Sequence, residues 1–257
     1  AQGRYPLGYY PHNIHFLWSA ASMLGDSETA IAAARKTAEK VSVGELEQFT
    51  FMQGFAAVPL QAYVRFGKWE ELLTVPYPGA NLMYYRIFWH YGRGMAFVRK
   101  GILNEAQEEL DSLASCLNKD IYKSINVSRN SAKKIAELAY NIVAGELLAA
   151  HDNQEQADEH FKKALEIEDS LIYFEPPAWH LPTRHNYGDF LVKTGAYKKA
   201  EIIYKEDLKK WKDNGWSLIG LYNCYVGLGD RNMANKTMAR FKNSWQYSDV
   251  EIKASVY

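Results

Sequence analysis

The chain has 257 residues, of which 47% are apolar and 23% are charged, as in an ordinary globular protein. Its 30 Lys and Arg residues balance 30 Asp and Glu residues, so the charge does not indicate nucleic acid or an anionic membrane as a partner. No apolar run approaches the roughly 18 to 20 residues of a membrane-spanning helix, and the first residues do not match a signal peptide.

Two isolated cysteines, Cys116 and Cys224, form neither a disulfide framework nor a metal-binding knuckle. We expect them to be buried free thiols. A single disulfide stays open, so the compartment is not fixed, with a slight preference for the cytoplasm. Strand signals are missing and large rings are frequent, which favours an all-α fold whose aromatic side chains wedge between helices.

A pattern of helix, short turn and helix recurs along the chain. When Gly145 is laid on Gly188, Ala157 falls on Ala200 and an aromatic residue falls on an aromatic residue four positions later. The small residues are expected to let paired helices approach closely, and the ring to fill the space toward the next pair. The predicted pairs span 15–34, 55–73, 88–110, 144–167, 187–210 and 215–238.

Three inserts separate these pairs and none is long or polar enough to be a flexible linker. They cover 72–85, 117–134 and 173–184. The last contains three prolines, which predicts an extended or turned segment rather than a helix. Pro59 is expected to interrupt the first helix of the second pair. The sequence therefore predicts one continuous domain over residues 1–257, with a capping tail near 246–257.

The pattern of a small residue in the first helix, a turn glycine, and a small residue followed by an aromatic in the second helix resembles the tetratricopeptide repeat. The stretches YYPHNIHFLW, EPPAWHLPTRHNYGDFL and NGWSLIGL are similar to the C-terminal half of bacterial tetratricopeptide proteins. This resemblance implies an α-solenoid of about six pairs, with further repeats upstream, so that the chain would be a fragment of a longer one. It implies no established reaction.

In such a solenoid the first helix of each pair lines a concave groove. The resemblance therefore points one stripe of each first helix into the groove, and His12 and His15 lie three apart on such a stripe. Trp179, His180 and Arg184 flank the rim of the groove in the Pro-rich insert, where Arg184 is available for a carboxylate. The candidate ligand-binding residues are His12, His15, Gln61, Phe88, Tyr91, Met95, Glu146, Trp179, Arg184, His185 and Asp189.

A metal site is the alternative interpretation of the histidines. Two imidazoles three residues apart on a helix can share a divalent transition metal, and another helix would have to supply further ligands. The candidate ligands are His12, His15, His90 and His185. The plainer interpretation is a hydrogen-bonded helix surface, a self-packed Pro-rich connector and tyrosines that pack between repeats.

The function expected from the sequence is a non-enzymatic binding module that takes a protein, a peptide or a small ligand in its groove. The second hypothesis is a histidine-cluster metal-binding protein or metal-dependent enzyme. The third is a scaffold whose groove is filled by its own upstream residues. Phosphate-binding glycine loops and nucleophile motifs are missing from the sequence, which favours binding over catalysis.

Overall fold

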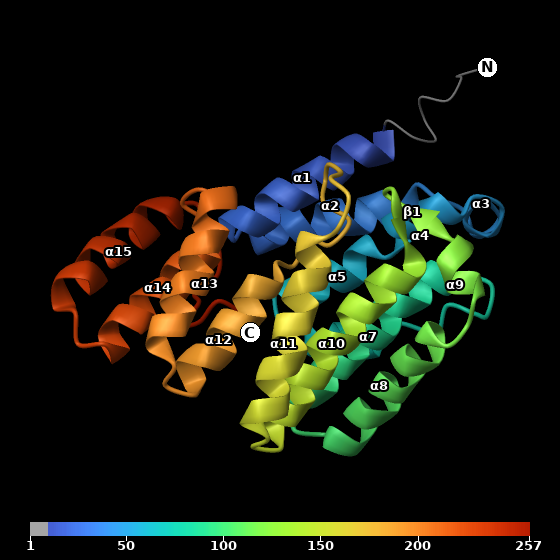
Figure 1. Ribbon diagram of the computed structural model, residues 1–257. Coiled ribbons are helices and arrows are strands. Elements are labelled where there is room, and N and C mark those ends of the chain that lie inside the picture. The colour runs from blue at the N-terminus through green and yellow to red at the C-terminus, as the bar shows by residue number, and fades with distance from the viewer. Residues whose placement is uncertain (1–9) are drawn as a thin grey trace.

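The computed structural model describes residues 10–257, and the regular structure of this region is almost entirely helical (Figure 1). The exception is a short antiparallel hairpin, β1 (Asn126–Val127) paired with β2 (Asn130–Ser131). The predicted all-α class is confirmed for these residues. Within the same range, no helix combines the length and the apolar character needed to cross a membrane.

The helices account for most of the described chain. They are α1 (Tyr10–Leu24), α2 (Ser27–Glu39), α3 (Val43–Gln48), α4 (Gln53–Ala56), α5 (Val58–Arg65), α6 (Trp69–Leu73), α7 (Met83–Lys100), α8 (Leu103–Leu117), α9 (Ile121–Ser124), α10 (Ala132–Ala150), α11 (Gln154–Asp169), α12 (Thr183–Lys193), α13 (Tyr197–Lys210), α14 (Gly215–Gly227) and α15 (Arg231–Ser244), with a 3₁₀ turn at Thr50–Met52.

Consecutive helices pack in pairs at the places that the repeat pattern predicts. The pairs are α1–α2, α5–α6, α7–α8, α10–α11, α12–α13 and α14–α15. The turn of each pair needs a residue with positive φ, which glycine adopts without steric cost. Glycine takes this position in five of the turns and Asp152, with φ 59°, takes it in the fourth pair. The turn glycines in the sequence are therefore required by backbone geometry.

Small residues and large rings hold neighbouring pairs together, as expected. A Cβ on Gly188 would lie 2.4 Å from the ring of Tyr204, and one on Gly220 would lie 2.1 Å from it. This ring therefore fills the space between α12 and α14. Phe161 has the same role in the preceding pair, because its ring lies 5.1 Å from that of Phe190 on α12.

The first helix of each pair contacts the first helix of the next pair, and α14 of the last pair contacts α1 of the first. We call α1, α5, α7, α10, α12 and α14 the inner helices. The indole of Trp216 on α14 donates a hydrogen bond to the carbonyl of Ser22 on α1 at 3.0 Å. Figure 1 shows α1 and α2 spanning the distance between α14 and the α7–α10 region. The row of inner helices therefore returns to its starting point.

The last residues do not simply cover the final pair, as a capping tail would. The Asp249 carboxylate accepts hydrogen bonds from the backbone N–H groups of Ser27 and Glu28, at the start of α2. The chain then turns inward, where Ser255 is fully buried and donates to the carbonyl of His185 at 2.7 Å. Figure 1 shows the C-terminal end in the middle of the molecule.

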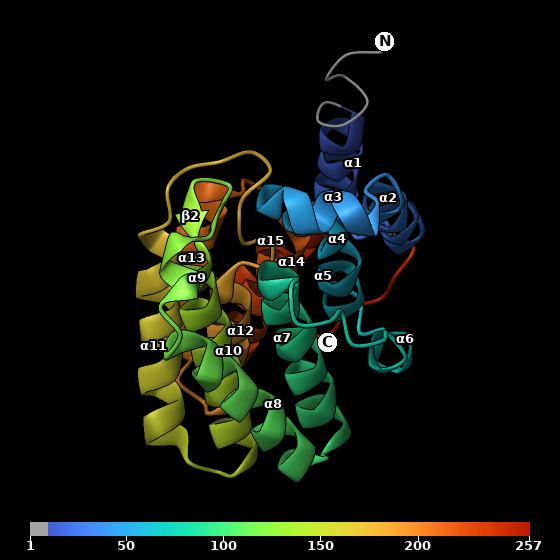
Figure 2. The ribbon, with the colours of Figure 1, turned by 90° about the vertical axis from the view of Figure 1, so that its right-hand side faces the viewer.

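The segments between pairs build the rest of the interior. Insert 117–134 contains α9 and the hairpin, whose turn residues Ser128 and Arg129 have positive φ. Residues 170–182 form no helix, as the prolines predict, and Figure 2 shows this loop arching at the top of the molecule. The Ile172 N–H of the loop donates a hydrogen bond to Asn130 of the hairpin. Pro59 lies in the first turn of α5, so the chain breaks between α4 and α5.

Candidate functional site

The apolar residues predicted to floor the groove belong to the hydrophobic core. Phe88, Tyr91 and Met95 on α7 are each at most 2% exposed. The Trp179 ring from the 170–182 loop packs over them, 5.6 Å from the Phe88 ring and 4.9 Å from the Tyr91 ring. These four side chains belong to one buried cluster and the loop covers them, so they offer no open surface.

His185 lies in a buried polar network in the middle of the molecule rather than on a groove wall. Its Nδ1 accepts a hydrogen bond from Arg65 at 3.0 Å, and its Nε2 lies 3.2 Å from the Asp207 carboxylate. Asn214 and Ser217 also donate to that carboxylate. Burial would raise the pKa of Asp207, but His185 and these donors lower it overall. His185 therefore links the Arg65 cation to the Asp207 anion.

Glu146 and Asp189 belong to a second central network. Arg99 binds Glu146 in a two-pronged ion pair with distances of 2.6 and 2.9 Å, and Asn186 donates to the same carboxylate. Asp189 pairs with Lys193 at 2.7 Å, although burial raises the pKa of its carboxyl group. Both predicted groove acids already have partners within the chain.

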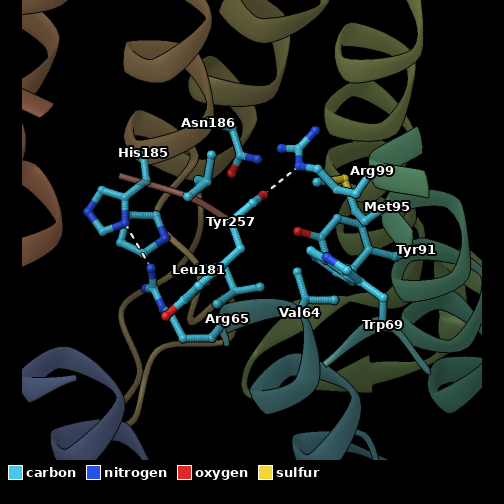
Figure 3. Close-up of a pocket in the computed structure, with 12 residues that line it drawn as sticks. Val64, Arg65, Trp69, Tyr91, Met95, Arg99, Leu181, His185, Asn186 and Tyr257 are labelled. Carbon is cyan, nitrogen blue, oxygen red and sulfur yellow. Dashed lines mark hydrogen bonds between the residues drawn. The ribbon is translucent and has the colours of Figure 1, made fainter. Parts of the chain in front are cut away.

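The space left in the middle is small. A cavity of about 20 Å³ lies between α5, α7, α12 and the end of the tail (Figure 3). The Tyr91 hydroxyl lines it without a protein partner among residues 10–257, and a cavity of this size holds about one water molecule. We call this region the central channel. Tyr257 closes it, and its carbonyl accepts a hydrogen bond from Arg99 at 2.5 Å.

Two further predicted residues have local partners. Arg184 forms a two-pronged ion pair with Asp169, both distances being 2.8 Å, so its guanidinium is already bound to a carboxylate. His90 lies 2.7 Å from Glu109, which Arg93 also contacts. The histidines named as metal ligands are thus distributed over separate networks. Across residues 10–257, no three His, Cys, Asp or Glu side chains gather in a group that could hold a metal ion.

His12, His15 and Gln61, by contrast, line an open pocket of about 300 Å³. We call it the side pocket. Its walls come from α1, α4, α5, the start of α7, the hairpin turn and residues 174–180 of the loop. Aromatic rings supply much of the wall, namely Phe51, Phe55, Tyr84 and Phe174. Tyr9, which begins the YYPHN stretch, lies outside the described residues.

A pair of imidazoles gives the side pocket its polar character. The rings of His15 and His180 lie 4.7 Å apart, and each residue is only 8% exposed. His15 Nε2 and both ring nitrogens of His180 have no hydrogen-bond partner in the described region of the chain. Burial, helped by His12, lowers the pKa of His15 to about 3, and burial lowers the pKa of His180 well below its usual value. Both imidazoles are therefore neutral at neutral pH.

Several of these pocket residues were not predicted. The sequence placed His180 only near a groove rim, and it gave no role to the hairpin turn or to Phe51, Phe55 and Phe174. The Trp179–His180 pair, which follows Pro176 and Pro177, was the one sequence signal for this part of the pocket. Its meaning depends on how the loop folds against α1, and that contact joins residues far apart in the chain.

Another depression, of about 420 Å³, lies on the far side of the Pro176–Pro177 segment. It includes the exposed side chains of Phe16 and Leu24. None of its described lining residues has a buried polar atom without a partner. The side pocket is therefore the stronger candidate for a specific site. A scan against family models finds no match to this chain, and a search of curated proteins finds none either.

Proposed function

We propose that the protein is a non-enzymatic binding protein of the tetratricopeptide-repeat type that binds a small molecule in the side pocket. The repeat assignment is supported by the helix pairs, their positive-φ turns and the close approach of Gly188 and Gly220 to Tyr204. Tetratricopeptide repeats usually bind ligands through rigid helices that present many contacts. Here the chain itself fills the central channel, so the side pocket is the candidate site for a ligand.

The observation that carries the proposal is the unpartnered imidazole pair in an open pocket. Burying a polar group without a hydrogen bond costs about 1 to 3 kcal/mol. The chain bears this cost at His15 and His180 beside a cavity of about 300 Å³, which is the smallest usual size for a small-molecule site. A ligand with hydrogen-bonding groups would supply the missing partners.

The other functions expected from the sequence have less support. A peptide in the central channel would have to displace the tail and the 170–182 loop, including the buried Ser255 and Trp179. A metal site would need a third ligand beside the imidazole pair, and the nearest groups in the described chain do not form one. Among the contacts of residues 10–257, no nucleophile lies within hydrogen-bonding distance of any of the three unpartnered imidazole nitrogens, so a catalytic role has no support from them.

The test is a ligand screen with the pocket open and blocked. Cys116 and Cys224 are buried, so an added surface cysteine would be the reactive one. Asn126→Cys at the pocket rim, labelled with a bulky maleimide, should abolish binding of fragments detected by NMR. Asn104→Cys, exposed on α8 and carrying the same label, should leave binding intact. Equal binding by both labelled proteins, or no fragment that binds the unlabelled protein, would refute the proposal.

A further inference from the structure

The charges around the side pocket limit the class of ligand that it can bind. The described segments that wall it include α1, α4, α5, α7 and the hairpin strands, and none of these contains an Asp or a Glu. Glu175 in the loop is the nearest acid along the chain, but it hydrogen-bonds Tyr173 and does not line the wall. No lining residue among those described is acidic.

Positive and protonatable groups surround the same space. His12, His15 and His180 line the pocket, and the exposed Arg129 stands at the hairpin turn on its rim. Behind His180, the buried Arg65 donates to the His180 carbonyl at 3.4 Å. A low-dielectric pocket with cations near it and no carboxylate favours an anion, because the field is not cancelled locally.

The apolar residues that line the side pocket indicate the shape of the uncharged part of the ligand. Phe51, Phe55, Phe174 and Tyr84 present rings to the pocket, and Ala178 and Pro177 add aliphatic surface. Rings of this kind pack best against flat apolar groups. A neutral imidazole can donate one hydrogen bond from its N–H group, so the pair can offer two donors to a carboxylate.

We infer that the side pocket binds a small aromatic carboxylate and takes up a proton onto its imidazole pair when it does so. This inference rests on the proposed small-molecule function and names the ligand class for it. The proton comes from solvent and forms an N–H bond on His15 or His180, while the ligand remains a carboxylate. No other bond is made or broken.

The proton uptake follows from the sign of the interactions. In the free protein, burial and the neighbouring His12 and Arg65 disfavour a charged imidazole at His15 or His180. An anion beside the pair reverses that balance and raises the pKa of the imidazoles. The complex then binds more protons than the free protein at mildly acidic pH, so affinity must increase as pH falls. A neutral ligand would show no such dependence, and a metal ion would bind more weakly as pH falls.

The experiment compares naphthoate with its uncharged analogue, naphthamide, by titration calorimetry on the whole chain between pH 8 and 5.5. Naphthoate should bind one per chain, with a Kd that changes little between pH 8 and 7 and falls below about pH 6, because a nearby anion raises a pKa by about 1 to 3 units from its lowered value in the free protein. The limit for one proton per ligand is about tenfold per pH unit, and titrations at pH 5.5 in two buffers of different ionisation heat should show that proton directly. Naphthamide should bind more weakly, with a Kd independent of pH.

Variants assign the proton to the imidazole pair. His15→Gln and His180→Gln keep a hydrogen-bonding side chain but cannot take up a proton, so each should flatten the pH dependence for naphthoate. His151→Gln changes an exposed histidine at the end of α10 and should retain it. If either pocket variant fails to fold, the proton count of the unmodified protein still decides the question.

The possible outcomes distinguish an error in the ligand class from an error in the proposed small-molecule function. If naphthamide binds as tightly as naphthoate, or if naphthoate binds without proton uptake, the ligand class is wrong while the pocket remains a site. Binding that requires zinc and weakens toward low pH would also overturn the inference. If neither probe binds and no fragment in the labelled-cysteine screen binds, the proposed function itself fails.

Discussion

The central channel and the side pocket both contain buried polar side chains, but the chain pairs the charged groups of the channel and leaves the imidazoles of the pocket unpaired among the described residues. In the channel, the charges of Arg65, Asp207, Arg99 and Glu146 are paired, and the tail covers them. In the side pocket, two buried imidazoles lie beside the open space and have no partners among the described residues. A buried polar group that is satisfied stabilises the fold, whereas an unsatisfied one needs a partner from outside the chain, such as a water molecule beside Tyr91 or a ligand in the pocket.

The largest expected effect is in the channel. Asp207→Ala removes the carboxylate that accepts from Ser217 and Asn214 and lies beside His185, and it leaves Arg65 buried without a nearby anion. We expect a loss of about 3 to 5 kcal/mol in the free energy of unfolding, measured with urea. Asp213→Ala breaks an exposed ion pair with Arg240 and should cost less than about 1 kcal/mol. Equal losses in the two variants would mean that the central network adds no stability.

The next effect is the response of the pocket to acid in the absence of ligand. The lowered pKa of His15, about 3, means that the unfolded chain gains a proton near pH 6.5 while the folded protein does not. Its contribution to stability is therefore complete above pH 6.5 and is lost progressively as pH falls toward 3. Between about pH 6.5 and 4.5 this amounts to about 2 to 3 kcal/mol.

His15→Gln removes that proton acceptor and should make the loss of unfolding free energy between about pH 6.5 and 4.5 smaller by this amount. The measurement is a pair of urea unfolding curves at the two pH values. His151→Gln should lose as much stability as the unmodified protein. A pH dependence that His15→Gln leaves unchanged would show that this imidazole becomes charged in the folded protein.

A smaller effect is expected where the tail enters the channel. Ser255→Ala removes a hydroxyl that joins Tyr204 and the His185 carbonyl, and it should cost about 1 to 2 kcal/mol. Hydrogen exchange of the tail amides should become faster, because the tail loses an anchor. Ser124→Ala breaks a bond within an exposed turn and should change stability by less than about 0.5 kcal/mol. Unchanged exchange in the tail would argue that Ser255 does not hold it.

The smallest effect has the opposite sign. His15→Phe replaces an unpartnered buried imidazole with an apolar ring beside Trp18 and Phe55. At neutral to slightly alkaline pH the free energy of unfolding should stay the same or increase by up to about 1 kcal/mol, because a desolvation cost disappears and no hydrogen bond from Nε2 is lost. A decrease of more than about 1 kcal/mol would mean that the imidazole stabilises the fold and would weaken its assignment to a ligand.

Local sequence features predicted the helix pairs, and distant contacts determined the site. The turn glycines and the Gly188–Tyr204 approach depend on residues within one pair or two neighbouring pairs, so a repeat pattern records them. The position of His15 against His180 depends on the Pro-rich loop reaching α1, and the filling of the channel depends on the tail. Neither segment has a periodic pattern that the sequence could reveal. The groove residues were therefore expected to face open space, whereas the loop and the tail occupy that space.

The contact between α14 and α1 has a consequence for how the chain is made. In an open array each new pair can pack on the one before it as synthesis proceeds. Here the carbonyl of Ser22 and the apolar side of α1 near Trp18 receive Trp216 only after most of the chain has been synthesised. The first pair must therefore leave the ribosome with an incomplete surface.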